Sequence, residues 1–232
     1  MREEPAVGDG DEDRLKLYRG KRHFDTTGEP RGAESPPGDE PSFVIQIHEA
    51  STTHFDFRLE VDGLLKSWSV PKGPSTDPND KRLAVPTEDH PLEYQEYEGV
   101  IPGGQYGAGA VIVWDRGTYR PHHSDGPDAF ARALERGHAS FTLNGAKLHG
   151  GYALTRIRSG KDGEREAWLL VKEKERKEKG RPAAKTAASG TPDPRRARSA
   201  LSGRTLRQVA DEAAESESEE TDEPNEADET GA

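Results

Sequence analysis

The stretch that decides the fold runs from residue 43 to residue 70 and reads FVIQIHEASTTHFDFRLEVDGLLKSWSV. Its centre is Asp62-Gly63, a dipeptide typical of the two-residue turn of a β-hairpin. Successive side chains of a strand point to opposite faces, so the phenylalanines and leucine before this turn face a core. The opposite face of the same strand then carries His54, Asp56 and Arg58.

Two imidazoles and one carboxylate lie close together in this stretch. His48 stands near the end of the strand that precedes His54, and Gln46, two residues earlier, would point to the same face as His48. A mixed nitrogen and oxygen donor set suits Mn²⁺, Fe²⁺ or Zn²⁺ better than Ca²⁺, which prefers oxygen ligands alone. A lone histidine would more often be structural, but two histidines and an acid on one hairpin favour a metal site formed by His48, His54 and Asp56.

Further strand patterns follow along the chain, separated by glycine, proline and polar residues. We expect strands at 43–48, 54–61, 64–70, 82–85, 110–114, 118–120, 140–143, 151–158 and 167–171. One short helix is predicted over 128–136, where Asp128 can cap its start. Short strands with almost no helix predict a mainly β fold, an antiparallel barrel or sandwich.

The composition divides the chain into three parts. Of the 232 residues, 33% are charged and only 30% hydrophobic, so part of the chain cannot be packed core. We expect a disordered acidic arm at 1–13, a folded domain at 14–172, and a disordered tail at 173–232, basic first and then acidic. The basic part is a candidate for electrostatic contact with nucleic acid, although a solvated, solubilising tail explains it equally well.

Several classes of protein are excluded by what the sequence lacks. The chain has no cysteine, which excludes disulfides, cysteine nucleophiles and thiolate metal sites. It has no apolar run of membrane-spanning length and no apolar signal core at its N-terminus, so we expect a cytoplasmic protein without a membrane partner.

A second polar cluster lies in KRLAVPTEDHPLEY, residues 81–94. Arg82 and His90 could donate hydrogen bonds to a phosphate, and Tyr94 could add a hydroxyl group. Lys72, in the rigid PKGPS loop at 71–75, could be aimed at the same phosphate. Without the metal cluster, residues 81–94 would be interpreted as an edge strand and loop with solvated charges, and Lys72 alone is equally compatible with an exposed turn.

Several motifs occur in the order of one known family. These are KRHFDTTGEP (21–30), HFDFRLEVDGLLKSWSVPKGPS (54–75), KRLAV (81–85) and EDHPLEYQEYEGVIPGGQYGAGAVIVWDRGTY (88–119). Together they resemble the 3′-phosphoesterase module of bacterial DNA ligase D, which also occurs as a stand-alone protein. The resemblance covers residues 15–171, and it implies a small closed antiparallel β-barrel with one or two short helices.

The resemblance also implies a function and a set of site residues. The family's metal, Mn²⁺ or another divalent transition metal, would be held by His48, His54 and Asp56. The positions of its catalytic residues are Arg58, His90, Arg22 and Glu29, and those that contact substrate phosphate are Lys72, Arg82 and Tyr94. The implied substrates are DNA or mixed DNA–RNA 3′ ends in a primer–template. The enzyme would remove a 3′ ribonucleoside and then the 3′-phosphate, to leave a 3′-hydroxyl.

The implied partners are a separate end-joining ligase, a polymerase or a Ku protein, and the chain is expected to be a monomer. Three positions depart from the family pattern: His23, the EASTT loop at 49–53, and Phe55. Two alternatives stay open. His54-Phe55-Asp56 also spells the His-x-Asp of an Fe(II) oxygenase, with His138 or His149 as the distal ligand. A non-catalytic protein that binds DNA ends is the other.

Overall fold

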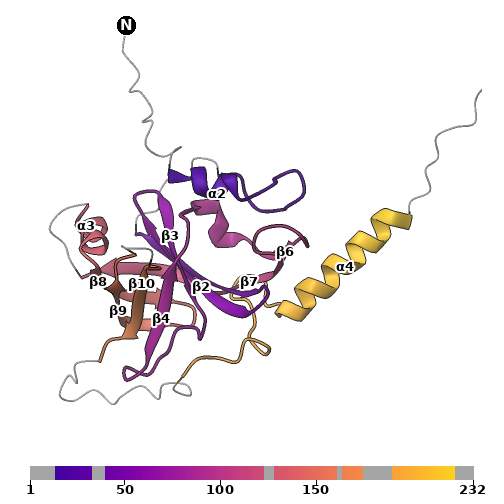
Figure 1. Ribbon diagram of the computed structural model, residues 1–232. Helices are drawn as coiled ribbons and strands as arrows, with labels where there is room; N and C mark the ends of the chain where they lie inside the picture. Colours follow the sequence, from indigo (N-terminus) through magenta and orange to yellow (C-terminus); the bar gives the residue numbers. More distant parts are fainter. Residues whose placement is uncertain (1–13, 33–39, 123–127, 161–163, 175–189, 223–232) are drawn as a thin grey trace, which may run out of the picture.

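Eight antiparallel strands close into a barrel in the computed structural model of the chain (Figure 1), which describes residues 14–32, 40–122, 128–160, 164–174 and 190–222. The strand order is β1-β2-β3-β4-β10-β9-β8-β7, and β7 pairs with β1 to complete the ring. The mainly β fold and its closed antiparallel barrel are therefore confirmed. The expected N-terminal arm lies outside the described residues.

The strands match the expected segments closely. The barrel strands are β1 (Ser42–Glu49), β2 (Thr53–Val61), β3 (Leu64–Val70), β4 (Lys81–Pro86), β7 (Gly109–Pro121), β8 (His138–Gly145), β9 (His149–Arg158) and β10 (Ala167–Lys172). Two short strands add to them: β5 (His90–Pro91) pairs with β3, and β6 (Gly99–Ile101) pairs with β7. The two strands expected at 110–114 and 118–120 form the single strand β7.

The barrel interior is filled by apolar side chains from the inner faces of the strands. The alternating residues of β2 point inward as expected, because Phe55, Phe57, Leu59 and Val61 all belong to one buried cluster. At the β2–β3 turn Asp62 and Gly63 have φ of 51° and 78°, the positive values that a primed hairpin turn requires. The turn therefore fixes which face of β2 is polar.

A second apolar cluster lies on the outer face of the same wall. The short helix α2 (Lys16–Gly20) and the 3₁₀ helix η1 (Leu92–Glu96) cover β1, β2 and β3 from outside. The cluster comprises Leu15, Tyr18, Val44, Leu64, Leu65, Leu92, Tyr94 and Val113. This wall of the barrel is consequently buried on both faces, and polar side chains on its outer face become enclosed.

The helix predicted over 128–136 is confirmed as α3 (Ala129–Glu135), which packs Phe130 against Tyr119 and Phe141. Among the described residues, no helix combines the length and the apolar character that a membrane span requires.

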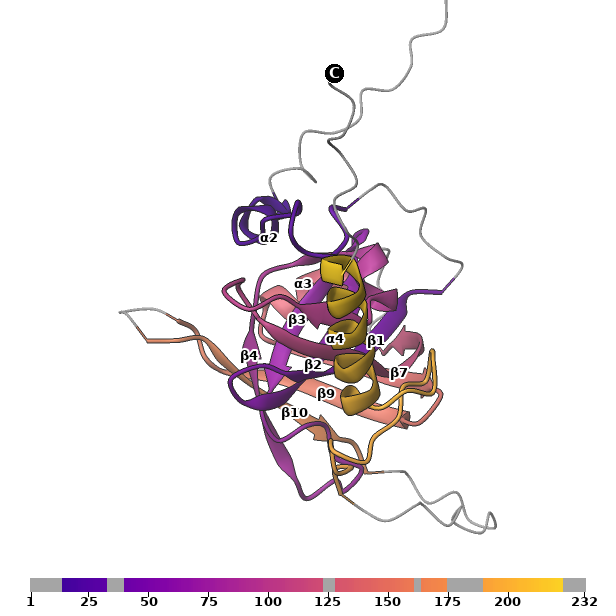
Figure 2. The same cartoon turned by 90° about the vertical axis from the view of Figure 1, so that its right-hand side faces the viewer.

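The C-terminal region differs from the expected disordered tail. Residues 190–205, here called the C-terminal strap, run along the barrel and lead into the helix α4 (Leu206–Asp222), which Figure 2 shows in front of the strands. The strap donates from Ala200 N–H to Val113 O at 2.8 Å and from Thr191 Oγ1 to Pro74 O at 2.9 Å. The prediction of disorder is wrong for residues 190–222, while 175–189 and 223–232 lie outside the described residues.

The physical reason is a gap in the sheet. Strand β7 pairs with β6 only at residues 109–111 and with β8 only from residue 117 onward. Between these pairings, Val113 has no strand partner on this edge of β7. Its carbonyl oxygen accepts from Ala200 N–H of the strap, and its N–H donates to the Glu98 carboxylate. Few apolar residues suffice for docking: Ala197, Leu206 and Val209 join the barrel core.

Candidate metal and phosphate site

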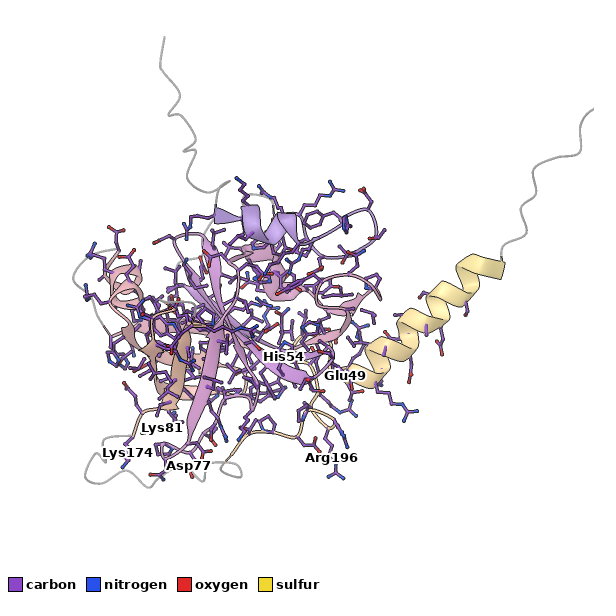
Figure 3. All side chains as sticks on the ribbon, viewed as in Figure 1. Glu49, His54, Asp77, Lys81, Lys174 and Arg196 are labelled. Carbon is purple, nitrogen blue, oxygen red and sulfur yellow. The ribbon has the colours of Figure 1, made fainter. Side chains whose placement is uncertain are left out.

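The polar face of the β1–β2 hairpin brings the predicted metal ligands together. The register places His48 directly opposite His54 and Gln46 opposite Asp56. Directly opposed residues of an antiparallel pair point to the same face, which here is the outer face of the barrel. In Figure 3, His54 lies near the middle of the view with Glu49 beside it, whereas Asp77 and Lys81 lie at the lower edge.

The three side chains form a compact donor set. One ligand atom from each of His48, His54 and Asp56 lies within 4.8 Å of the others. His54 Nε2 is 3.5 Å from Asp56 Oδ1, and His48 Nδ1 is 3.8 Å from Asp56 Oδ2. The three residues can therefore hold a metal ion, and two imidazoles with one carboxylate fit a divalent transition metal.

Backbone carbonyl groups fix both imidazoles in the tautomer that a metal needs. The other ring nitrogen of His48, Nε2, donates to Gly107 O at 2.6 Å, and Nδ1 of His54 donates to Thr52 O at 2.9 Å. In the neutral form of each ring, the nitrogen that faces Asp56 therefore carries the lone pair. A Cβ at Gly107 would come within 3.4 Å of the His48 ring, and its φ of 77° also favours glycine. This glycine permits the close contact.

Burial and charge set the protonation of the three residues in different directions. Burial lowers the pKa of His48, which favours its neutral form. Burial alone would raise the pKa of Asp56, but Arg58 and the hydrogen bond from His54 outweigh it and hold this pKa below its ordinary value. For His54, the hydrogen bond and charge of Asp56 outweigh burial and raise the pKa. Asp56 is thus an anion throughout the physiological range.

Arg58 is fixed on three sides. Its Nη2 donates to Asp56 Oδ2, its Nη1 to Ser67 Oγ and its Nε to Gln46 Oε1, each at 2.9 Å. Gln46 is fully buried and donates to the carbonyl oxygens of residues 94 and 97. The guanidinium therefore stands beside the metal ligands in one orientation.

His90 lies between two guanidinium groups. Its Nδ1 is 2.9 Å from Arg58 Nη1 and 2.8 Å from Glu88 O, and its Nε2 is 3.2 Å from Arg22 Nη2. A guanidinium nitrogen only donates, so Nε2 accepts from Arg22, whereas Nδ1 faces both a donor, Arg58 Nη1, and an acceptor, Glu88 O. Burial, then Arg58 and Arg22, lower the pKa of His90 well below its ordinary value. The predicted cluster of Arg58, His90 and Arg22 is thus present in space.

The remaining predicted residues take different places. Glu29 is buried behind Arg22, which it binds at 2.8 Å, and accepts from the Tyr94 hydroxyl at 2.9 Å, so it positions its neighbours rather than lining the cavity. Tyr94 lines the cavity with its ring. The structure does not bring Lys72 and Arg82 to the cavity wall. Lys72 is exposed beyond β3, and Arg82 pairs with Asp80 at 2.7 Å.

The cavity has a volume of about 270 Å³ and includes residues that the sequence did not single out. Glu88 binds Lys21 at 2.9 Å and Arg22 at 3.1 Å, tying the N-terminal segment to the site. Tyr106 lines the rim from the loop between β6 and β7. The only signal for either was its place in the EDHPLEY and PGGQYGAG motifs, because neither has a metal-binding spacing.

His138 and His149, the distal ligands that the oxygenase alternative requires, lie elsewhere. Both are exposed at the starts of β8 and β9, and neither belongs to the His48, His54 and Asp56 cluster within the described ranges.

Comparison with known proteins identifies a family. A model of the DNA ligase D 3′-phosphoesterase domain matches residues 46–156. The multifunctional non-homologous end joining protein LigD of Pseudomonas aeruginosa is 51% identical over 164 residues, which cover 69% of this chain and 19% of that protein. The LigD proteins of Mycobacterium tuberculosis and Mycolicibacterium smegmatis are 44% identical over 167 residues (72% of this chain, 20% of that protein) and 41% identical over 172 residues (71% and 21%).

The chain spans about a fifth of the length of these relatives. The matched segment contains the metal cluster together with Arg58 and His90. The chain therefore belongs to the family of DNA ligase D 3′-phosphoesterase domains.

Proposed function

We propose that the chain is a metal-dependent phosphoesterase that processes 3′ ends of DNA or mixed DNA–RNA strands in end-joining repair. It removes a 3′ ribonucleoside and then the 3′-phosphate, leaving a 3′-hydroxyl. The observation that carries the proposal is the three-residue metal cluster beside the guanidinium groups of Arg58 and Arg22. The family match and the names of the relatives, which are non-homologous end joining proteins, support the substrate class.

Different residues of the site have different roles in the proposed reaction. When bound, Mn²⁺ or another divalent transition metal polarises a phosphoryl oxygen and offsets its negative charge. Arg58 and Arg22 orient the phosphoryl group and stabilise the charge that develops on it. The lowered pKa of His90 favours its neutral form, and the ring contacts both Arg22 and Arg58, which favours a role in positioning these two guanidinium groups over a role as proton donor.

The other predicted residues act at a distance from the reacting atoms. Glu29 and Tyr94 position Arg22 and Arg58 for the diesterase step. Lys72 and Arg82, which lie outside the cavity, would contact phosphates of the strand farther from the 3′ end. A separate end-joining ligase, polymerase or Ku protein would bring this monomer to a broken end.

The test is release of phosphate from a DNA primer–template with a 3′-phosphate in the presence of Mn²⁺. We expect His48→Ala and Asp56→Ala to abolish product and to weaken Mn²⁺ binding measured by calorimetry. His149→Ala, which removes an exposed histidine outside the cluster, is the matched control and should behave as wild type.

Wild-type turnover in either cluster variant would contradict the assignment. Loss of activity in His149→Ala, with consumption of oxygen and 2-oxoglutarate, would favour the oxygenase instead. Tight binding of DNA ends by the wild type with no product under any divalent cation would favour a non-catalytic end-binding protein.

A further inference from the structure

An exposed aromatic ring stands at the rim of the cavity. Tyr106 is 52% exposed although it lines the same cavity as the metal ligands. The other tyrosine of this cavity, Tyr94, is almost fully buried and its hydroxyl group is bound to Glu29. Exposed single tyrosines are common on protein surfaces, so exposure alone assigns no role. The position of Tyr106 beside the metal cluster is what points to a role.

The loop that carries Tyr106 is fixed to the metal site. The next residue, Gly107, accepts the hydrogen bond that sets the tautomer of His48. The residue before it, Gln105, donates to Thr26 Oγ1 at 2.9 Å, which ties the loop to the N-terminal segment. Backbone bonds from Gln105 to Pro102 and from Ala108 to Gln105 close the loop on itself. Tyr106 is therefore held one residue from a metal-ligand contact.

A cation accompanies the ring. Lys21 Nζ lies 4.4 Å from the ring centroid and 3.3 Å from the hydroxyl group, and Glu88 holds it at 2.9 Å. The lysine covers one part of the ring while half of the residue stays exposed. An aromatic ring next to an ammonium group is the combination that binds a nucleotide unit, because the ring stacks on a base and the cation attracts the phosphate backbone.

We propose that Tyr106 and Lys21 form a subsite for the terminal nucleobase of the strand whose 3′-phosphate lies in the cavity. The inference rests on the proposed function. The base and the 3′-phosphate are attached to the same sugar, so a phosphate bound in the cavity by Arg58 and Arg22 has its base one sugar away, within reach of the rim. Among the aromatic residues of the cavity wall, Tyr106 alone is more than half exposed. Stacking tolerates any base, so the subsite selects for a nucleoside without reading sequence.

The experiment compares a single-stranded oligonucleotide that ends in a normal 3′-phosphorylated nucleotide with one whose last nucleotide is abasic. Affinity is measured by fluorescence anisotropy without metal, so the outcome does not depend on turnover. We expect wild type to bind the normal end about tenfold more tightly, or about 1.4 kcal/mol, which lies within the range for one stacked base. Tyr106→Ala should remove this preference, and Tyr106→Phe should restore it.

Turnover supplies a second readout. With Mn²⁺, Tyr106→Ala should raise KM for the normal end about tenfold, with kcat little changed, and should not change KM for the abasic end, which has no ring to stack. Mn²⁺ affinity should stay at the wild-type value, which shows that the His48 contact is intact. The control is Ile157→Ala, a comparably exposed residue at 53% outside the cavity.

Two results would overturn the inference. One is a wild type that binds normal and abasic ends equally. The other is a Tyr106→Ala variant that keeps the full preference for the normal end. If wild type prefers the normal end in binding but releases no phosphate with any divalent metal, the subsite stands and the proposed phosphoesterase function fails.

Discussion

The hydrogen bonds behind the site set the chemistry of single residues. Two backbone carbonyl groups determine the tautomers of His48 and His54, and the side-chain amide of Gln46 orients Arg58. Such supporting contacts fix a ligand as firmly as its own rotamer does.

Gln46 provides the first prediction at this scale. Gln46→Ala leaves Arg58 Nε without its acceptor and Tyr97 O without the Gln46 donor, at about 1–3 kcal/mol for each unsatisfied group. Tyr94 O, by contrast, keeps the hydrogen bond from Tyr97 N–H. We expect kcat/KM for 3′-phosphate release to fall at least about tenfold while Mn²⁺ affinity stays within about twofold. Steady-state kinetics and calorimetry measure these two quantities.

The control is Gln208→Ala, which changes an exposed glutamine on α4. Equal kcat/KM in Gln46→Ala and wild type would show that Arg58 needs no such support. A large loss of Mn²⁺ affinity would show instead that Gln46 acts on the metal ligands.

The sequence predicts some residues of the site better than others. Strand alternation places His54, Asp56 and Arg58 correctly because the inner side of β2 is unbroken in its apolar character. In KRLAV the same reasoning is ambiguous, because apolar residues occur at both odd and even positions and therefore on both faces of the strand. Ala84 is in the core and Leu83 is 43% exposed, so Arg82 shares the inward parity of Ala84. Tyr106 could not be predicted, because its place depends on loop glycines with positive φ.

At the scale of elements, the N-terminal segment completes the site. Helix α2 and the turn after it supply Arg22 to the cavity, and they dock through Leu15, Tyr18 and the ion pairs of Glu88. The docking is sensitive to pH. Burial alone would raise the pKa of Glu88, but Lys21 and Arg22 hold it below the ordinary value of 4.5.

The lowered pKa of Glu88 determines how stability changes with pH. A carboxyl group whose pKa is lowered by folding contributes stability that is present above its unfolded pKa and is lost as the pH falls through the folded value. We expect the free energy of unfolding to fall below about pH 4.5. Glu88→Gln should cost about 1–3 kcal/mol at neutral pH and make the acid loss shallower.

Urea denaturation between neutral pH and about pH 3 checks this prediction. Glu96→Gln is the control, because Glu96 is exposed and pairs with a partly exposed arginine. If Glu88→Gln lost as much stability in acid as wild type, another carboxyl group would be responsible.

The hairpin turn at Asp62-Gly63 and the strands beside it follow from local sequence alone. The elements β5, β6 and η1 do not, because each is short and exists only through its packing on β3 or β7. Helix α4 was missed for a related reason. The polar and acidic sequence around them hides the spacing of Leu206 and Val209, three residues apart, which face the barrel.

At the scale of the whole molecule, closure of the barrel depends on residues far apart in sequence. Strand β1 pairs with β7, and the C-terminal strap seals the remaining edge of β7. The exposed arginines of the strap, Arg195, Arg196 and Arg198, form no ion pair with an acidic side chain within the described ranges. These side chains are thus available to an anionic partner, and electrostatic contact of the basic region with nucleic acid stays a prediction.

The strap and α4 give the last prediction. Leu206→Ala removes a buried leucine from the core and should cost about 2–3 kcal/mol. For a chain of this size that loss lowers Tm by about 4–12 °C. Differential scanning calorimetry measures it, and Leu201→Ala, at a strap leucine that is 43% exposed, should shift Tm little. Equal small shifts in both variants would mean that α4 does not stabilise the barrel.

The metal ligands stand on the outside of the barrel wall, and its bore is packed with side chains. No polymer has to be threaded through a tunnel to reach them. Under the proposed function, a 3′ terminus would therefore be trimmed whatever the length of the strand behind it, and other proteins could stay bound upstream while the end is processed.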